Sequence, residues 1–181
     1  MRTTWTIDPA HSEIGFEVKH LMISKVRGGF GAVTGTVELD DSDLSKSVVL
    51  AEIDATSVDT REEKRDAHLR SADFFDVERF PKLTFRSTRV ESKGSGEVVL
   101  VGDLTIRDVT REVRLAVTDE GRGKDPWGGE RAGFSATGKI DRRDFGLTWN
   151  QALETGGVLV ANEIKLILDI QAVKTPAEQA A

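Results

Sequence analysis

The sequence predicts an all-β fold of eight antiparallel strands, arranged as a barrel or a sandwich, with one short helix inserted around residues 60–71. Eight segments alternate between apolar and polar residues, which is the period of a strand with one dry and one wet face. Turn-forming residues separate the segments, and no long helical pattern comes between them. The segments lie at residues 12–20, 33–39, 49–53, 83–88, 98–106, 113–117, 132–140 and 158–173.

The first of these segments alternates most strictly. Apolar side chains take one side of it, and charged side chains take the other. We therefore expect Phe16, Val18 and His20 to face the interior of the protein, and Glu17 and Lys19 to face water. A shift of one residue would reverse all five, so the prediction is sharp.

The segment over residues 60–71 breaks the alternation and has the composition of a helix. Glu62 and Glu63 stand where the first turn of a helix favours acidic residues. The segment is short and strongly charged, so most of it should face solvent. Phe74 and Phe75 follow directly, and we expect them to attach it to the rest of the protein.

Composition and charge narrow the class of protein. A chain of 181 residues is long enough for one sizeable core and shows no linker, so we expect a single domain over residues 1–173 and a disordered tail over 174–181. The net charge is −6 and the basic residues are scattered, which predicts no nucleic-acid partner. Cysteine is absent, which excludes disulfides and thiolate chemistry.

The apolar residues also bear on location. The chain has no run of about 20 apolar residues, so we do not expect it to span a membrane. No leader peptide precedes the first strand, which predicts a cytoplasmic protein.

Ten short motifs follow one another along the chain. They are IDPAHS at 7–12, KHL at 19–21, GGF at 28–30, SVDT at 57–60, RDAHLRS at 65–71, DFFD at 73–76, FP at 80–81, FRST at 85–88, GDLTI at 102–106 and RDFGL at 143–147. Each is weak by itself, but so many in one order are very specific. From Trp5 to about Ile170 the chain therefore resembles the YceI-like (polyisoprenoid-binding, lipocalin-like) family.

The resemblance implies an eight-stranded antiparallel lipocalin-like β-barrel. It also implies a long apolar tunnel that holds the tail of a polyisoprenoid or similar lipid, in a carrier or storage protein that is not an enzyme. The alternating pattern alone leaves two states open, a barrel filled by side chains and a barrel that holds one small ligand. The alternative function is an enzyme that acts on a hydrophobic substrate within the same barrel, with His20 and a facing carboxylate as its acid–base pair.

Candidate tunnel-lining residues are inward-facing residues of the predicted strands and aromatic residues beside them. They are Ile14, Phe16, Val18, His20, Met22, Phe30, Ala51, Phe75, Phe85, Phe134, Ala136, Phe145 and Trp149. The candidates for binding a polar head group are His20, Arg142 and Arg143. Because Asp144 is adjacent, structural ion pairs at the barrel rim are the preferred interpretation of the two arginines.

No catalytic residue, metal site or cofactor is expected from the sequence. Three histidines without convergent spacing do not make a metal motif, and no serine lies in a nucleophile elbow. The expected partner is a hydrophobic small molecule, a polyprenyl-type lipid, and a homodimer is left open.

Overall fold

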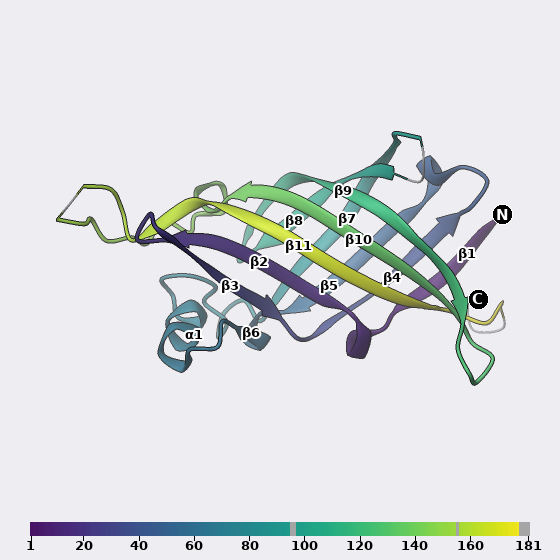
Figure 1. The fold of residues 1–181 in the computed structure, drawn as a ribbon, viewed down its shortest axis with the longest axis horizontal. Helices are drawn as coiled ribbons and strands as arrows, with labels where there is room; N and C mark the ends of the chain where they lie inside the picture. The colour runs from purple at the N-terminus through teal and green to yellow at the C-terminus, as the bar shows by residue number, and fades with distance from the viewer. Residues whose placement is uncertain (95–96, 155, 178–181) are drawn as a thin grey trace.

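The strands form one antiparallel sheet that closes into a barrel in this computed structural model, which describes residues 1–94, 97–154 and 156–177 (Figure 1). Eight strands of the described chain make the ring, which is closed where β11 pairs with β1. The predicted eight-stranded barrel is therefore confirmed. In ring order the strands are β1 (Arg2–Ile7), β4 (Val33–Asp40), β5 (Val48–Asp54), β7 (Lys82–Ser92), β8 (Glu97–Ile106), β9 (Val109–Lys124), β10 (Glu130–Asp141) and β11 (Val160–Lys174).

Three further strands extend the sheet beyond the ring, in the order β2 (Glu13–His20), β3 (Ser24–Phe30) and β6 (Val58–Asp59). Two strands pair with the long strand β11: β1 pairs with its residues 172–174, and β2 pairs with its residues 160–169. The predicted barrel strand at residues 12–20 is therefore β2, which belongs to this extension, and β1 takes its place in the ring.

The glycines of β3 are needed for close packing. Gly28 and Gly29 lie in a regular strand paired with β2. A Cβ atom on Gly28 would lie 2.6 Å from the ring of Phe16 and 2.7 Å from the methyl group of Thr60. Gly28 therefore lets the β2–β3 hairpin approach the segment that leads into the helix.

The predicted helix is confirmed as α1 (Glu63–Arg70), and its N-terminus is capped by the Glu62 carboxylate, which accepts from the backbone N–H groups of Lys64 and Arg65. Four single-turn 3₁₀ helices also occur in the described residues: η1 (Pro9–His11), η2 (Leu44–Lys46), η3 (Ala55–Ser57) and η4 (Arg142–Phe145). None of the helices in the described chain is long and apolar enough to cross a membrane.

Glu17 lies on the face of β2 that the alternation predicts, but the prediction that it is exposed to water is wrong. Glu17 pairs across the sheet with Arg27 and Lys165, and its carboxylate lies 3.3 Å from the Lys25 ammonium and 3.5 Å from the Arg27 guanidinium. These long side chains cover it, so only 7% of Glu17 is exposed, while Lys19 is exposed as expected. Burial raises the pKa of Glu17, but the pairing with Lys25 and Arg27 outweighs it and holds the pKa below its ordinary value.

The chain stays ordered slightly beyond the predicted domain boundary. Lys174 is the last residue of β11, and the backbone N–H of Thr175 donates to the carbonyl of Thr4 at 2.8 Å. Within the expected tail at 174–181, Lys174 therefore belongs to the sheet, and residues 178–181 lie outside the described chain.

Candidate functional site

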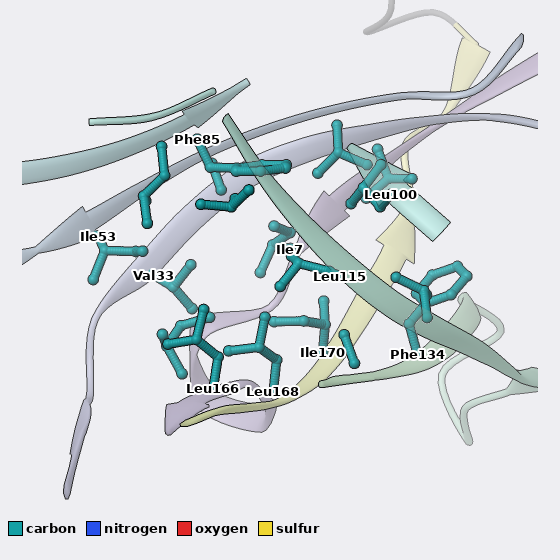
Figure 2. Close-up of a pocket in the computed structure, with 18 of the residues that line it drawn as sticks. Ile7, Val33, Ile53, Phe85, Leu100, Leu115, Phe134, Leu166, Leu168 and Ile170 are labelled. Atoms are coloured by element: carbon teal, nitrogen blue, oxygen red, sulfur yellow. The ribbon is translucent and has the colours of Figure 1, made fainter. Parts of the chain in front are cut away.

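The barrel encloses an apolar cavity of about 230 Å³ (Figure 2). Apart from Ser47 and Asp119, every described residue that lines it is apolar. Its lining includes inward-facing residues of several strands, such as Val33, Val37 and Leu39 of β4, Leu100, Leu104 and Ile106 of β8, and Leu166, Leu168 and Ile170 of β11. Figure 2 shows side chains of different strands, among them Val33, Phe85 and Leu168, pointing into a shared space.

The cavity exists because the inward side chains do not fill the ring. Ala51 and Ala136 present only a methyl group to the interior. Val49 and Val117 face inward and yet stay partly accessible, which would not occur in a packed core. An apolar cavity of about 150 Å³ already stays dry and binds a molecule such as benzene. Of the two states left open by the sequence, the structure has the barrel with room for a ligand.

Aromatic rings form the wall of the cavity nearest α1, which lies at one end of the barrel together with β6 (Figure 1). Phe30 and Phe75 line the cavity, with ring centroids 5.4 Å apart in an edge-to-face arrangement. Phe16 packs behind them, 5.8 Å from Phe30. We call this part of the molecule, with α1, η4 and the loop after η4, the helix end of the barrel.

Buried polar groups hold the helix end together. Asp66 is 5% exposed, and its carboxylate accepts from the backbone N–H of Thr60 at 2.8 Å and from its hydroxyl at 2.5 Å. The Nε of Arg65 donates to the same hydroxyl oxygen at 2.7 Å. Trp149 packs against His68 of α1 and against Phe74, with centroid distances of 4.5 and 5.6 Å. The helix is thus attached to the barrel by both hydrogen bonds and aromatic packing.

At the opposite end of the barrel, β1 begins and β11 ends (Figure 1), and charged side chains lie there. The guanidinium of Arg122 forms a bidentate ion pair with the carboxylate of Asp119, with N–O distances of 2.7 and 3.0 Å. It also lies 5.3 Å from the ring of Phe134, which lines the cavity, and 5.6 Å from the ring of Trp5. Arg122 therefore separates the apolar interior from an open polar pocket.

The polar pocket is lined by Thr3, Trp5, Asp41, Asp119, Gly121, Arg122, Glu130 and Lys174. Asp119 lines both this pocket and the apolar cavity, so the two spaces adjoin each other at this residue. Burial raises the pKa of Asp119, but the hydrogen bonds from Arg122 and the Gly121 backbone hold the pKa below its ordinary value. Asp119 is therefore ionised at neutral pH. We call this region the polar end of the barrel.

Seven of the candidate tunnel residues line the cavity: Ile14, Phe30, Ala51, Phe75, Phe85, Phe134 and Ala136. Gly102 contributes to this arrangement, because a Cβ atom there would lie 2.5 Å from the ring of Phe85. Without a side chain at Gly102, that ring lies directly against β8.

The other candidate tunnel residues are not among the described residues that line the cavity: Phe16, Val18, His20, Met22, Phe145 and Trp149. On β11 the lining ends at Leu166, which pairs with Phe16. Val18 and His20 pair with residues of β11 beyond that point, and Met22 is 54% exposed in the turn after β2. Phe145 is buried in the core, and Trp149 lies in the aromatic packing of the helix end.

The head-group candidates also lie away from the cavity lining of the described chain. The guanidinium of Arg142 is 3% exposed and donates to the backbone carbonyls of residues 147, 149, 160 and 161 at 2.6 to 3.3 Å. Arg143 pairs with Asp141 at 2.6 Å on the surface. These contacts give both arginines structural partners, main-chain carbonyls for Arg142 and Asp141 for Arg143, in place of the ion pairs with Asp144 that their adjacency suggested. His20 lies near the tip of the β2–β3 hairpin.

Sequence reasoning missed the residues of the polar end. The inward phase of Leu115 and Val117 continues to Asp119, because β9 runs to Lys124 instead of ending near residue 117. The sequence therefore contained one indication of the polar end, a charged residue, Asp119, at an inward-facing position of a strand. Arg122 gave no such signal, because a glycine-rich stretch around it is typical of a turn.

Comparisons with known proteins identify relatives over nearly the whole chain. The family described as YceI-like domain matches residues 5–172. A UPF0312 protein of Staphylococcus aureus strain N315 is 43% identical over 164 residues, which cover 90% of this chain and 93% of the relative.

Solved structures agree with these matches. The YceI protein of Campylobacter jejuni is 30% identical, with a TM-score of 0.75 over 87% of this chain and 90% of that one. A polyisoprenoid binding domain from Saccharophagus degradans has a TM-score of 0.68 and is 13% identical, over 96% of this chain and 99% of that one. At that identity the second likeness shows the fold alone.

Proposed function

The chain belongs to the YceI-like domain family, and from that premise we propose that it binds one isoprenoid or other long-chain lipid inside its barrel, as a carrier or storage protein. The observation that carries the proposal is the enclosed cavity, whose described lining is apolar except for Ser47 and Asp119. The name of the related domain from Saccharophagus degradans supports an isoprenoid as the ligand. The cytoplasmic location stays a prediction from the sequence, and the homodimer stays open.

The physics of such a ligand suits this site. Each methylene group that moves from water into an apolar site contributes about 0.8 kcal/mol. A chain of several isoprene units therefore binds through burial alone, without a reacting group in the cavity. The branched side chains of β4, β8 and β11 offer a wall that matches a flexible hydrocarbon and no directional contact that would select one tail.

No specific observation favours the alternative, an enzyme within the same barrel. Its expected base, His20, is absent from the described lining, and Asp119 is held ionised by Arg122. We therefore propose the carrier or storage role and not the enzyme.

A matched pair of substitutions tests the proposal. Ala136→Leu places a larger side chain in the cavity between Val117 and Leu168, both of which line it. Ala116→Leu adds the same atoms to the same two-strand ladder on the exposed outer face, opposite Thr137. We expect Ala136→Leu to reduce binding of geranylgeraniol to the delipidated protein by about tenfold or more, since it removes space for the tail, and Ala116→Leu to leave binding unchanged.

Stability of the same variants separates a cavity from a packed core. Overpacking a filled core costs about 1–3 kcal/mol, whereas a leucine that enters empty space should leave the melting temperature of the delipidated protein nearly unchanged. Native mass spectrometry of the freshly purified protein should show a bound lipid that organic extraction removes. A wild type that retains no lipid and binds no geranylgeraniol, together with a destabilised Ala136→Leu, would mean that the proposed function is wrong.

A further inference from the structure

The apolar cavity and the polar pocket adjoin each other, because Asp119 lines both. Building on the proposed function, we infer that the head group of the ligand occupies the polar pocket and is an uncharged group that donates and accepts hydrogen bonds, such as a hydroxyl or an amide, and not a phosphate or a carboxylate. The inference rests on the charges that line this pocket and on how they are paired.

The pocket carries more negative than positive charge. Its described lining holds two cations, Arg122 and Lys174, and three carboxylates, those of Asp41, Asp119 and Glu130. Each cation already has a partner: Arg122 pairs with Asp119 at 2.7 Å and with Asp41 at 3.4 Å, and Lys174 pairs with Glu130 at 3.1 Å. No surplus positive charge is left for an anionic head group.

Packing against aromatic rings holds Arg122 in place. The guanidinium of Arg122 is stacked near the rings of Trp5 and Phe134, and it is 30% exposed. Turning away from Asp119 toward an anion would break a two-pronged ion pair and leave a partly buried carboxylate without its partner, which is costly. A diphosphate in the pocket would also lie beside that carboxylate, and like charges at short range repel.

An uncharged polar head meets complementary groups instead. A hydroxyl or amide donates to the Asp119 carboxylate, which accepts only, and its oxygen accepts from the N–H groups of Arg122 or from Lys174. A ligand that ends in hydrocarbon would cover Asp119 and offer it no hydrogen bond, so the polar end also selects against a tail without a head. The tail in the cavity supplies affinity, and the polar end selects the head.

Three ligands with similar tails test the inference on the delipidated protein. They are geranylgeraniol, geranylgeranyl diphosphate and phytane, compared at one ionic strength by titration calorimetry or by displacement of a fluorescent lipid. We expect the alcohol to bind at least about tenfold more tightly than the diphosphate, and more tightly than the hydrocarbon. Asp119→Asn removes one negative charge from the pocket, so it should raise the affinity for the diphosphate and reduce the ratio of the alcohol affinity to the diphosphate affinity. The control Asp141→Asn, at the other end of the barrel, should leave this ratio unchanged.

The outcomes are distinguishable. If the diphosphate binds more tightly than the alcohol, or if alcohol and hydrocarbon bind equally, the inference is overturned while lipid binding stands. If none of the three binds, the proposed function fails, and the inference fails with it. Should Asp119→Asn not fold, Glu130→Gln removes a more exposed negative charge from the same pocket and should shift the affinity for the diphosphate in the same direction.

Discussion

The helix end and the polar end of the barrel both contain charged side chains, but they use them in opposite ways. At the helix end, Asp66 and Arg142 are almost fully buried and bond to groups of neighbouring segments, including main-chain N–H and carbonyl groups. At the polar end, Arg122 and Lys174 pair with carboxylates and stay partly exposed. Buried charges that satisfy the main chain stabilise a fold, whereas exposed pairs contribute little to stability.

This difference suggests a division of roles between the two ends. The helix end closes the cavity with aromatic rings and holds α1 and the loop after η4 in place. The polar end contains charged groups that are paired with one another and partly exposed, which suits a site where a head group meets water. Stability should therefore depend mainly on the helix end, and ligand selection mainly on the polar end.

The largest effect should come from Arg142→Met. The substitution keeps much of the side-chain volume but removes the donors that four backbone carbonyls share. Leaving buried acceptors unsatisfied costs about 1–3 kcal/mol each, and we expect a total loss of about 3–5 kcal/mol in the free energy of unfolding. Urea denaturation followed by tryptophan fluorescence measures it. The neighbouring Arg143→Met should cost less than about 1 kcal/mol, and equal losses in the two variants would contradict the structural role of Arg142.

A smaller effect is expected at the polar end from Arg122→Gln. This variant loses the ion pair with Asp119 and the contacts with two aromatic rings, and it should lower the free energy of unfolding by about 1 kcal/mol. In the same variant, geranylgeraniol should bind more weakly while phytane binds as before. A stability loss as large as that of Arg142→Met would show that the polar end is part of the structural core, and the division of roles would be wrong.

The smallest effect should be a pH dependence at Asp141, an exposed pair of the helix end. Arg143 lowers the pKa of Asp141 from 3.8 to about 2. A carboxyl whose pKa is lower in the folded state stabilises the protein above its unfolded pKa, and it loses this contribution as the pH falls through the folded pKa. The wild type should therefore exceed Asp141→Asn in stability by less than about 1 kcal/mol at pH 5–7, and the difference should shrink between pH 4 and pH 2. A difference that grows on acidification would have the wrong sign for this pair.

Much of the barrel could be predicted because each strand carries its own pattern. The alternation of β5, β7, β8, β10 and β11 shows which residues point inward, and Ala51, Phe85 and Ala136 accordingly line the cavity. The helix α1 was visible as a break in the same pattern. Local periodicity suffices for these features because side-chain direction follows directly from the backbone conformation.

Features that depend on distant partners could not be predicted in this way. Glu17 has the pattern of a solvent-facing residue, but side chains on two neighbouring strands bury it. Arg142 and Arg143 are adjacent in sequence, yet one is buried among carbonyls and the other pairs on the surface. In each case the outcome depends on register and on loops far away in the chain.

By itself, the amino-acid sequence determined the class of fold, the number of ring strands, the single helix and the family, because these follow from local periodicity and from motifs in order. Only the tertiary structure decided that β1 and β2 share β11, that the barrel encloses a cavity, and that Asp119 and Arg122 stand at its polar end. Closure of the sheet is the physical reason. It brings β1 beside β11, so that Trp5, Arg122 and Lys174 lie close together although more than a hundred residues separate the first from the others.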